Sequence, residues 1–137
     1  MDPSDVSAGS PAGDEAELLL TADDRHLAVV DAQLLRIFVG ADQKHGHKPL
    51  YEAIILAARE RHLAGATVLR GALGYGAGSR IHTSKILRVS EDLPVVVEIV
   101  DTRAKIEAFV SVVDAMMGKG LITLESVRVI AYRHDGR

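Results

Sequence analysis

The sequence contains no cysteine, and aromatic residues make up only 4% of its 137 positions. Without cysteine the chain can form no disulfide framework, no zinc-thiolate site and no thiol nucleophile. Because hydrophobic residues still make up 47% of the chain, we expect a core of Val, Ile, Leu and Ala rather than of stacked aromatic rings. That mixture is typical of a sheet covered by helices.

Long apolar runs and an N-terminal basic region are also missing. No run approaches the roughly 18 residues that a membrane-spanning helix needs, and the first basic residue is Arg25. Signal and transit peptides carry basic residues near their start, whereas this chain begins with Asp2, Asp5, Asp14 and Glu15. We therefore expect a soluble cytoplasmic protein.

Charge divides the chain into two parts. Residues 1–33 contain eight acidic residues and one basic residue, whereas residues 34–137 contain eleven acidic and fifteen basic residues. The first part begins with a stretch rich in Ser, Gly, Pro and Asp, so we expect an acidic and mostly disordered extension over residues 1–33. Residues 34–133 are expected to form one folded domain, since this length fits a single core. Its small basic excess favours an anionic ligand but is too weak for a nucleic-acid-binding face.

Hydrophobic periodicity predicts alternating strands and helices within the domain. Two segments have the 3.6-residue period of a helix: residues 50–62, which follow Pro49, and residues 102–117, which Asp101 or Thr102 can cap. The predicted strands are residues 34–39, 66–73, 81–89 (the third strand or an extension of it), 94–100 and 121–132. The near-continuous apolar run at residues 94–100 predicts a strand buried on both faces.

Two β-α-β halves joined by a hairpin describe a ferredoxin-like fold of the α+β class, in the order β-α-β-β-α-β. Right-handed crossovers place both helices on one face of a four-stranded antiparallel sheet. The opposite face is then bare, and an exposed apolar sheet of this size is typical of an oligomer interface. We therefore expect a closed cyclic oligomer built around the bare faces.

The loop from Gly71 to Gly78, which joins the two middle strands, is the feature most indicative of ligand binding. Glycine-rich loops let backbone N–H groups approach an anion. This loop fits neither a Walker A motif nor a dinucleotide fingerprint, because no Gly-Lys-Ser/Thr follows it and no helix opens after it. A flexible turn is the plain alternative. Against that alternative stands a set of polar donors after the glycines, which includes the types of side chain that grip phosphates: Arg80, His82, Ser84 and Lys85.

Histidines and serines elsewhere carry weaker signals. His45 and His47 have a spacing that can chelate a metal, but the sequence fixes no third ligand nearby, so solvated loop histidines are the favoured interpretation. His62, at the end of the first helix, is expected to bond the last helix carbonyls. Ser79 and Ser84 lack the strand-to-helix setting of a nucleophile and His82 has no orienting acid, so we predict that the protein is not an enzyme.

Several segments together resemble a known family. Residues 69–87 read LRGALGYGAGSRIHTSKIL, residues 90–101 read SEDLPVVVEIVD, and shorter matches are LRIFVG at 35–40 and KPLYEAI at 48–54. Over residues 34–130 the chain closely resembles the bacterial PII-like proteins catalogued as domain of unknown function 190. The resemblance implies a ferredoxin-like homotrimer related to the PII signalling proteins, which bind adenine nucleotides between subunits and use a loop to engage a partner.

Two short segments resemble the nucleotide-contacting parts of PII proteins. Gly74-Tyr75-Gly76 looks like the Gly-aromatic-Gly triplet at the base of the PII loop, and Gly118-Lys119-Gly120 falls where a second nucleotide-contacting loop is expected. Ala77 stands where PII proteins usually carry a basic residue, which favours a nucleotide with fewer phosphates or another small anion. The candidate ligand-binding residues are Gly71, Gly74, Tyr75, Gly76, Gly78, Arg80, His82, Lys85 and Lys119.

These observations predict a non-enzymatic PII-like signalling protein that binds an adenine nucleotide or another small anion at inter-subunit clefts and regulates a partner, such as a membrane transporter. Two alternatives stay open. One is a ligand-independent interaction module whose loop contacts a partner directly, and the other is a metal-responsive trimer that uses His45, His47 or His82. A further hypothesis is that the acidic extension lies across the cationic domain and competes with an anionic ligand.

Overall fold

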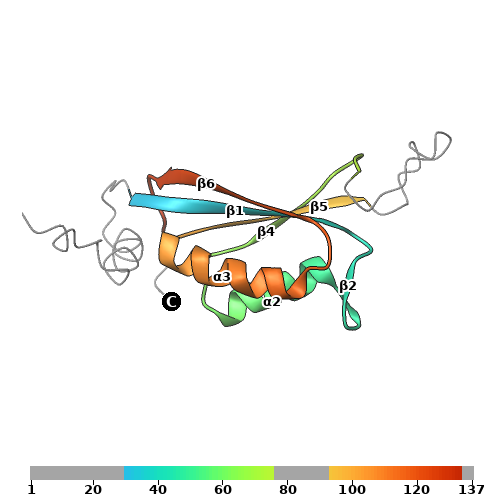
Figure 1. The fold of residues 1–137 in the computed structure, drawn as a ribbon. Coiled ribbons are helices and arrows are strands. Elements are labelled where there is room, and N and C mark those ends of the chain that lie inside the picture. Colours follow the sequence, from blue (N-terminus) through green and yellow to red (C-terminus); the bar gives the residue numbers. More distant parts are fainter. Residues whose placement is uncertain (1–29, 76–92, 134–137) are drawn as a thin grey trace, which may run out of the picture.

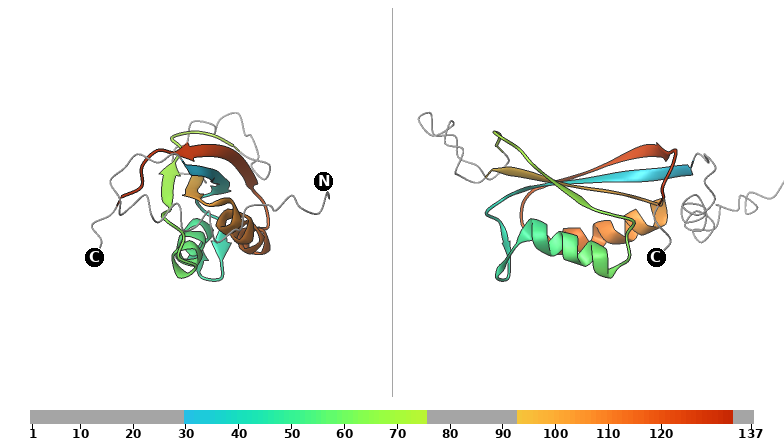
Figure 2. Two further views of the ribbon diagram at one scale, coloured as in Figure 1. Left: turned by 90° about the vertical axis from the view of Figure 1, so that its left-hand side faces the viewer. Right: turned by 180° about the vertical axis from the view of Figure 1, so that it is seen from behind.

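The structure, a computed structural model, describes residues 30–75 and 93–133 (Figure 1). Within these residues a four-stranded antiparallel sheet has the order β4-β5-β1-β6, and a separate hairpin is formed by β2 and β3. The strands are β1 Val30–Gly40, β2 Lys44–His45, β3 Lys48–Pro49, β4 Thr67–Arg70, β5 Pro94–Asp101 and β6 Leu121–Val129. The helices are α2 Leu50–Glu60 and α3 Arg103–Met116. Both helices lie on one face of the sheet (Figures 1 and 2), which confirms the predicted α+β, ferredoxin-like arrangement.

The central strands determine which residues form the core. β1 pairs with β5 along residues 33–40 and with β6 along residues 30–38, in unbroken antiparallel register. Because successive side chains of a strand point to opposite faces, every second residue lies under the helices. The buried residues of this set are Leu35, Ile37 and Val39 in β1 and Val95, Val97 and Ile99 in β5.

Each helix buries the apolar stripe that its period predicts. α2 begins directly after Pro49, whose missing N–H needs no partner at a helix start. At the start of α3 the Lys105 N–H donates to Thr102 Oγ1 at 3.4 Å, so Thr102 is the cap. The buried residues of α2 are Leu50, Ala53, Ile54, Ala57 and Ala58, and those of α3 are Ile106, Phe109 and Val113. No helix within residues 30–75 and 93–133 is long and apolar enough to cross a membrane.

Several element boundaries differ from the prediction. β1 begins at Val30 instead of residue 34, because backbone pairing with β6 continues through residues whose polar side chains break the apolar pattern. β4 ends at Arg70, where its pairing with β5 ends, and β6 ends at Val129. The polar stretch after β1 contains the hairpin of β2 and β3, which was not predicted. The predicted strand at residues 81–89 lies outside the described residues.

The prediction that β5 is buried on both faces is wrong for the single chain. Val96, Glu98 and Val100 point away from the helices and are only partly buried, because no element of the described residues covers that side (Figure 2). We call this side of the sheet the open face. Its side chains in the four strands include Leu34, Arg36, Phe38, Leu69, Val96, Glu98, Val100, Leu121 and Glu125.

The open face is apolar with a charged centre. Leu69 and Leu121, on the two outer strands, are 48% and 55% exposed. Between them Arg36 of β1 donates from Nε to Glu98 Oε2 at 2.8 Å, and its Nη1 lies 3.1 Å from Glu125 Oε1. The hydrogen bond with Glu98 raises the pKa of Arg36 above its ordinary value, so this guanidinium stays charged.

Candidate functional site

Gly71 and Gly74 lie against Pro94, the first residue of β5. The Gly71 N–H donates to the Pro94 carbonyl at 2.8 Å. A Cβ atom added at Gly71 would lie 2.5 Å from Pro94 Cγ, and one added at Gly74 would lie 3.0 Å from it. A larger residue at either position would have to displace the proline ring. Close packing is therefore one reason why these two predicted ligand residues are glycines.

The turn after α3 lies at the same end of the sheet. Gly120 has a φ of 143°, in a region that other residues rarely adopt. Its backbone passes so close to β1 that an added Cβ would lie 2.6 Å from the Phe38 carbonyl oxygen. Gly118, in contrast, has nothing within 4 Å of an added Cβ. Only Gly120 of this pair is therefore required to be glycine by the described structure.

The side chain of Gln43 joins this turn to the end of β1. Its Nε2 donates to the Lys119 carbonyl at 2.9 Å, and its Oε1 accepts from the Gly40 N–H at 2.6 Å. Since Gly40 pairs with Pro94, Lys119 and the first residues of the predicted glycine loop lie at one end of the sheet, on the right in Figure 1. We call this region the glycine end; it comprises Gly40, Gln43, Gly71, Gly74, Pro94 and residues 118–120.

The β2–β3 hairpin adds basic side chains beside the glycine end. Lys44, His45, His47 and Lys48 are all exposed on it, and Gly46 forms its tip with a φ of 63°. The Leu50 N–H donates to the Gln43 carbonyl at 2.7 Å, which closes the base of the hairpin. Gly46, between His45 and His47, is the sequence signal that could have predicted this turn. Across residues 30–75 and 93–133, no three His, Asp or Glu side chains are grouped so that they could hold a metal ion.

The other predicted ligand residues are either exposed or outside the described residues. Tyr75 is 75% exposed. Arg70, next to the glycines, was not predicted as a site residue; its Nη2 donates to the Tyr51 hydroxyl at 2.8 Å, and its guanidinium carbon lies 5.2 Å from the centre of the Tyr51 ring. The positions of Gly76, Gly78, Arg80, His82 and Lys85 are not described, so their place in a site stays a prediction.

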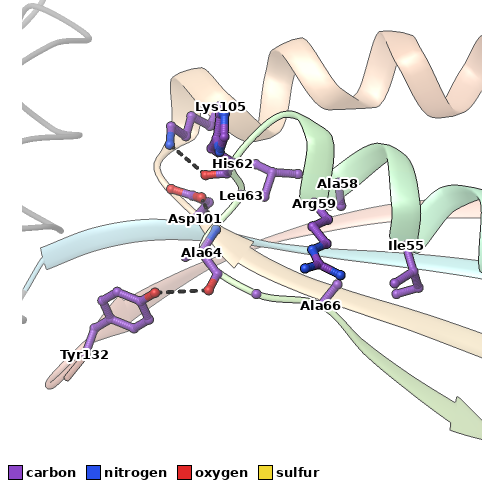
Figure 3. Close-up of a pocket in the computed structure, with 11 residues that line it drawn as sticks. Ile55, Ala58, Arg59, His62, Leu63, Ala64, Ala66, Asp101, Lys105 and Tyr132 are labelled. Carbon is purple, nitrogen blue, oxygen red and sulfur yellow. Dashed lines mark hydrogen bonds between the residues drawn. The ribbon is translucent and has the colours of Figure 1, made fainter. Parts of the chain in front are cut away.

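The opposite end of the sheet contains two cavities that the sequence did not reveal. One, of about 460 Å³, lies on the side of the helices and is shown in Figure 3; we call it the helix-side cavity. Its lining includes Ile55, Ala58, Arg59, His62, Leu63, Ala66, Asp101, Lys105 and Tyr132. The other, of about 630 Å³, opens on the open face and is called the open-face cavity. Its lining includes Leu34, Thr67, Glu98, Val100, Val129 and Tyr132.

Residues 64–66 line both cavities, and hydrogen bonds hold this turn in place. Asp101, only 2% exposed, accepts the Ala64 N–H at Oδ2 (2.8 Å) and the Thr102 N–H at Oδ1 (2.7 Å). The Tyr132 hydroxyl donates to the Ala64 carbonyl at 3.0 Å. Both backbone polar groups of Ala64 are therefore fixed by side chains from distant parts of the chain. We call residues 62–66 with Asp101, Thr102, Lys105 and Tyr132 the turn end.

The chain enters this turn in an unfavourable backbone conformation. His62 has a φ of 57°, in the left-handed region that favours glycine. Its carbonyl accepts from Lys105 Nζ at 3.0 Å. The prediction that the His62 side chain bonds the last helix carbonyls is wrong, because that side chain makes no hydrogen bond to another described residue. Arg61 Nη1 instead donates to the Ala57 carbonyl, at 3.3 Å.

Comparisons with known proteins agree with this architecture. The model of the DUF190 family, described as "Uncharacterized ACR", matches residues 32–129. A UPF0166 protein of Aquifex aeolicus (strain VF5) is 44% identical over 106 residues, which cover 76% of this chain and 98% of the relative. A UPF0166 protein of Methanocaldococcus jannaschii is 28% identical over 102 residues, which cover 74% of this chain and 94% of the relative.

Solved structures are similar at lower sequence identity. A PII-like signalling protein of Thermus thermophilus has a TM-score of 0.54 at 15% identity, over 76% of this chain and 94% of its own. CPII of Thiomonas intermedia K12, a nitrogen regulatory PII-like protein, gives 0.54 at 12% identity with ADP, AMP and acetate bound, over 79% of this chain and 100% of its own. The structure of CPII with ADP, AMP and bicarbonate bound has a TM-score of 0.51 at 14% identity. The match covers 79% of this chain and 99% of the CPII chain.

These similarities confirm the predicted PII-like ferredoxin fold. The family match covers nearly all of the described residues and agrees with the resemblance seen in the sequence. The chain belongs to the DUF190 family.

Proposed function

We propose that this protein is a non-enzymatic, cytoplasmic regulatory protein of the PII-like type. It assembles as a trimer through the open face, binds an adenine nucleotide or another small anion in the clefts between subunits, and regulates a partner protein such as a membrane transporter. The observation that carries the proposal is the uncovered open face, where apolar side chains on all four strands surround the Arg36 network.

The positions of the open-face cavity and the glycine end support a ligand site shared between chains. The cavity includes Leu34 of β1, whereas the glycine end begins at Gly40 of the same strand. At about 3.3 Å per residue these positions are about 20 Å apart. Within one chain the open-face cavity is therefore far from the glycine end, but a neighbouring chain packed on the open face can bring its own glycine end to that cavity. A volume of about 630 Å³ is in the range of small-molecule sites.

The chemistry of the glycine end supports an anionic ligand. The side chains of Lys119 and of the hairpin lysines Lys44 and Lys48 lie there with no hydrogen bond or ion pair to another described residue. CPII, whose fold is similar, binds ADP and AMP in its solved structures. Gly71, Gly74, Gly76, Gly78, Tyr75, Arg80, His82 and Lys85 remain the proposed further contacts.

Sedimentation velocity and calorimetry on the full chain test this proposal. We expect a trimer that binds at least one of ATP, ADP, AMP, cyclic nucleotides and bicarbonate. Leu121→Glu, on the open face, should yield a monomer that no longer binds the ligand, because the cleft needs two chains. Leu124→Glu is the matched control, since Leu124 is 45% exposed on the other face. A trimer that binds none of these ligands, or a wild-type monomer, would contradict the proposal.

A second candidate, the ligand-independent interaction module, is favoured by the β2–β3 hairpin. The hairpin is fixed at its base by Gln43 and presents four exposed basic or histidine side chains, a form suited to contact with an acidic partner surface. Deleting residues 75–79, and separately replacing Lys44 and Lys48 by Ala, distinguishes the two functions. Loss of partner capture with unchanged ligand affinity would favour the interaction module.

A further inference from the structure

The helix-side cavity has no role in the proposed function. It opens between the end of α2 and the start of α3, on the helix side of the turn formed by residues 64–66 (Figure 3). The open-face cavity lies on the other side of that turn. A ligand in the helix-side cavity therefore needs neither a nucleotide nor a second copy of the chain.

Most polar groups around the helix-side cavity already have partners. Lys105 Nζ donates to the His62 carbonyl, and the Tyr132 hydroxyl donates to the Ala64 carbonyl. Both carboxylate oxygens of Asp101 accept backbone N–H groups. These bonds fix the walls of the cavity before any ligand arrives, and such preorganisation reduces the entropic cost of binding.

Arg59 is the charged exception. Its guanidinium makes no hydrogen bond or ion pair with any residue in 30–75 or 93–133, whereas the guanidinium of neighbouring Arg61 donates to the Ala57 carbonyl. The His62 imidazole also lines the cavity without a hydrogen bond to a described residue, but Arg59 is the residue whose side chain is always charged. Figure 3 shows the Arg59 side chain reaching from α2 across the cavity toward Ala66. A guanidinium presents parallel N–H donors that match the two oxygens of a carboxylate.

The charges and the apolar walls define the chemical class of a ligand. Lys105 and Asp101 carry opposite charges at one side of the cavity, so the charge of Arg59 has no counterpart among the described lining residues. Beside Arg59 the wall is apolar, formed by Ile55, Ala58 and Leu63, all of which belong to the hydrophobic core or pack against it. One unpaired cation next to an apolar wall suits a monoanion with a small hydrophobic body. A dianion would meet the buried Asp101 carboxylate without a second free cation.

We propose that the helix-side cavity binds a small monocarboxylate whose carboxylate pairs with Arg59. Its aliphatic or aromatic body lies against Ile55, Ala58 and Leu63. The site is separate from the proposed nucleotide cleft, so this proposal does not depend on the proposed function.

Titration of the full-length protein with isobutyrate and benzoate, followed by ¹H–¹⁵N NMR, tests the site. We expect saturable shifts of the Arg59, Leu63, Gly65 and Ala66 amides, and weaker binding of acetate, which lacks a hydrophobic body. Inorganic phosphate should bind more weakly than either probe. No saturable shift with either probe, tighter binding of phosphate, or shifts confined to the glycine end would overturn the proposal.

Two variants at neighbouring positions show whether Arg59 is the partner. Arg59→Gln should weaken isobutyrate binding about 10- to 100-fold, the range for loss of a charged hydrogen-bonding partner. Arg61→Gln is the matched control and should bind as the wild type does, because Arg61 does not line the cavity. Equal loss in both variants would show general charge attraction and overturn the site. Nucleotide affinity is measured by calorimetry on the same samples, and Arg59→Gln should leave it unchanged. Loss of isobutyrate binding can then be told apart from loss of nucleotide binding, which belongs to the proposed function.

Discussion

The two ends of the sheet are held together in opposite ways. At the glycine end, backbone segments touch because side chains are absent, as where Gly71 meets Pro94 and Gly120 meets Phe38. At the turn end, a backbone turn is held because a side chain is present, as where the Asp101 carboxylate receives the Ala64 N–H. Adding a side chain should therefore damage the glycine end, whereas removing a side chain should damage the turn end.

The largest effect is expected from removal of the carboxylate at the turn end. Asp101→Ala leaves the partly buried N–H of Ala64 and the buried N–H of Thr102 without their acceptor, and should lower the free energy of unfolding by about 4 kcal/mol, the summed cost of two unpaired donors. Urea denaturation measures this change. Asp101→Asn keeps one acceptor oxygen and should cost about half as much.

Asp114→Ala is the matched control for the turn end. Asp114 is exposed on α3, so its loss should change stability by no more than about 0.5 kcal/mol. Equal destabilisation by Asp101→Ala and Asp114→Ala would show that the carboxylate does not hold the turn.

The next largest effect is expected from addition of a side chain at the glycine end. Gly120→Ala places a Cβ 2.6 Å from the Phe38 carbonyl oxygen at a φ of 143°, and should destabilise the fold by about 3 kcal/mol through backbone strain and overpacking. Gly118→Ala is the control in the same turn, because an added Cβ there meets nothing within 4 Å. Thermal unfolding of both variants measures the difference, and similar melting temperatures would refute the requirement for glycine at position 120.

A smaller effect should come from Gln43, the side chain that anchors the glycine end. Gln43→Ala removes two hydrogen bonds, to Gly40 and Lys119, and should lower stability by about 1.5 kcal/mol. Gln33→Ala is the control: it removes one exposed hydrogen bond to Ser126, at 3.3 Å, and should cost less than about 0.5 kcal/mol. Amide hydrogen exchange near Lys119 should be faster in the Gln43 variant and unchanged in the Gln33 variant. Unchanged exchange in both variants would show that Gln43 does not anchor the turn at Lys119.

The smallest effect has the opposite sign. His62→Gly removes a side chain from a residue with a φ of 57°, and should stabilise the protein by about 0.7 kcal/mol because glycine adopts this conformation without strain. Arg61→Gly, one residue earlier at a φ of −93°, gains no such relief and should be destabilising. Urea midpoints of the two variants measure this contrast, and a less stable His62 variant would mean that the imidazole makes a contact that outweighs the strain.

Much of the fold follows from local pattern. The two-residue alternation in β1 and β5 predicts the buried face, and the 3.6-residue period in α2 and α3 predicts the buried stripes. Alternation does not reveal whether the second face of a strand is covered. That is why the apolar run from Pro94 to Val100 predicted burial on both faces, whereas the single chain buries only one.

The candidate site was predictable only in part. The glycines and Lys119 carry a recognisable local pattern, and the structure places Gly71, Gly74 and Lys119 at one end of the sheet. The two cavities have no such pattern, because their walls come from distant parts of the chain. The helix-side cavity is lined from α2, α3 and the segment after β6, and the open-face cavity is lined from all four strands of the sheet. Likewise the hairpin at Gly46 is stabilised by Gln43, whose partner Lys119 is 76 positions away.

Patterns in the sequence predicted the two helices with their buried stripes, the buried face of β1 and the glycine-rich loop, because these depend on residues a few positions apart. Which distant groups meet depends on the tertiary structure. Asp101 and Ala64 are 37 positions apart, and Tyr132 and Ala64 are 68 positions apart. Pairing at such separation depends on how the whole sheet brings strand ends together. The turn end, its cavities and the guanidinium of Arg59, which has no partner among the described residues, are therefore features of the folded chain and not of any local pattern.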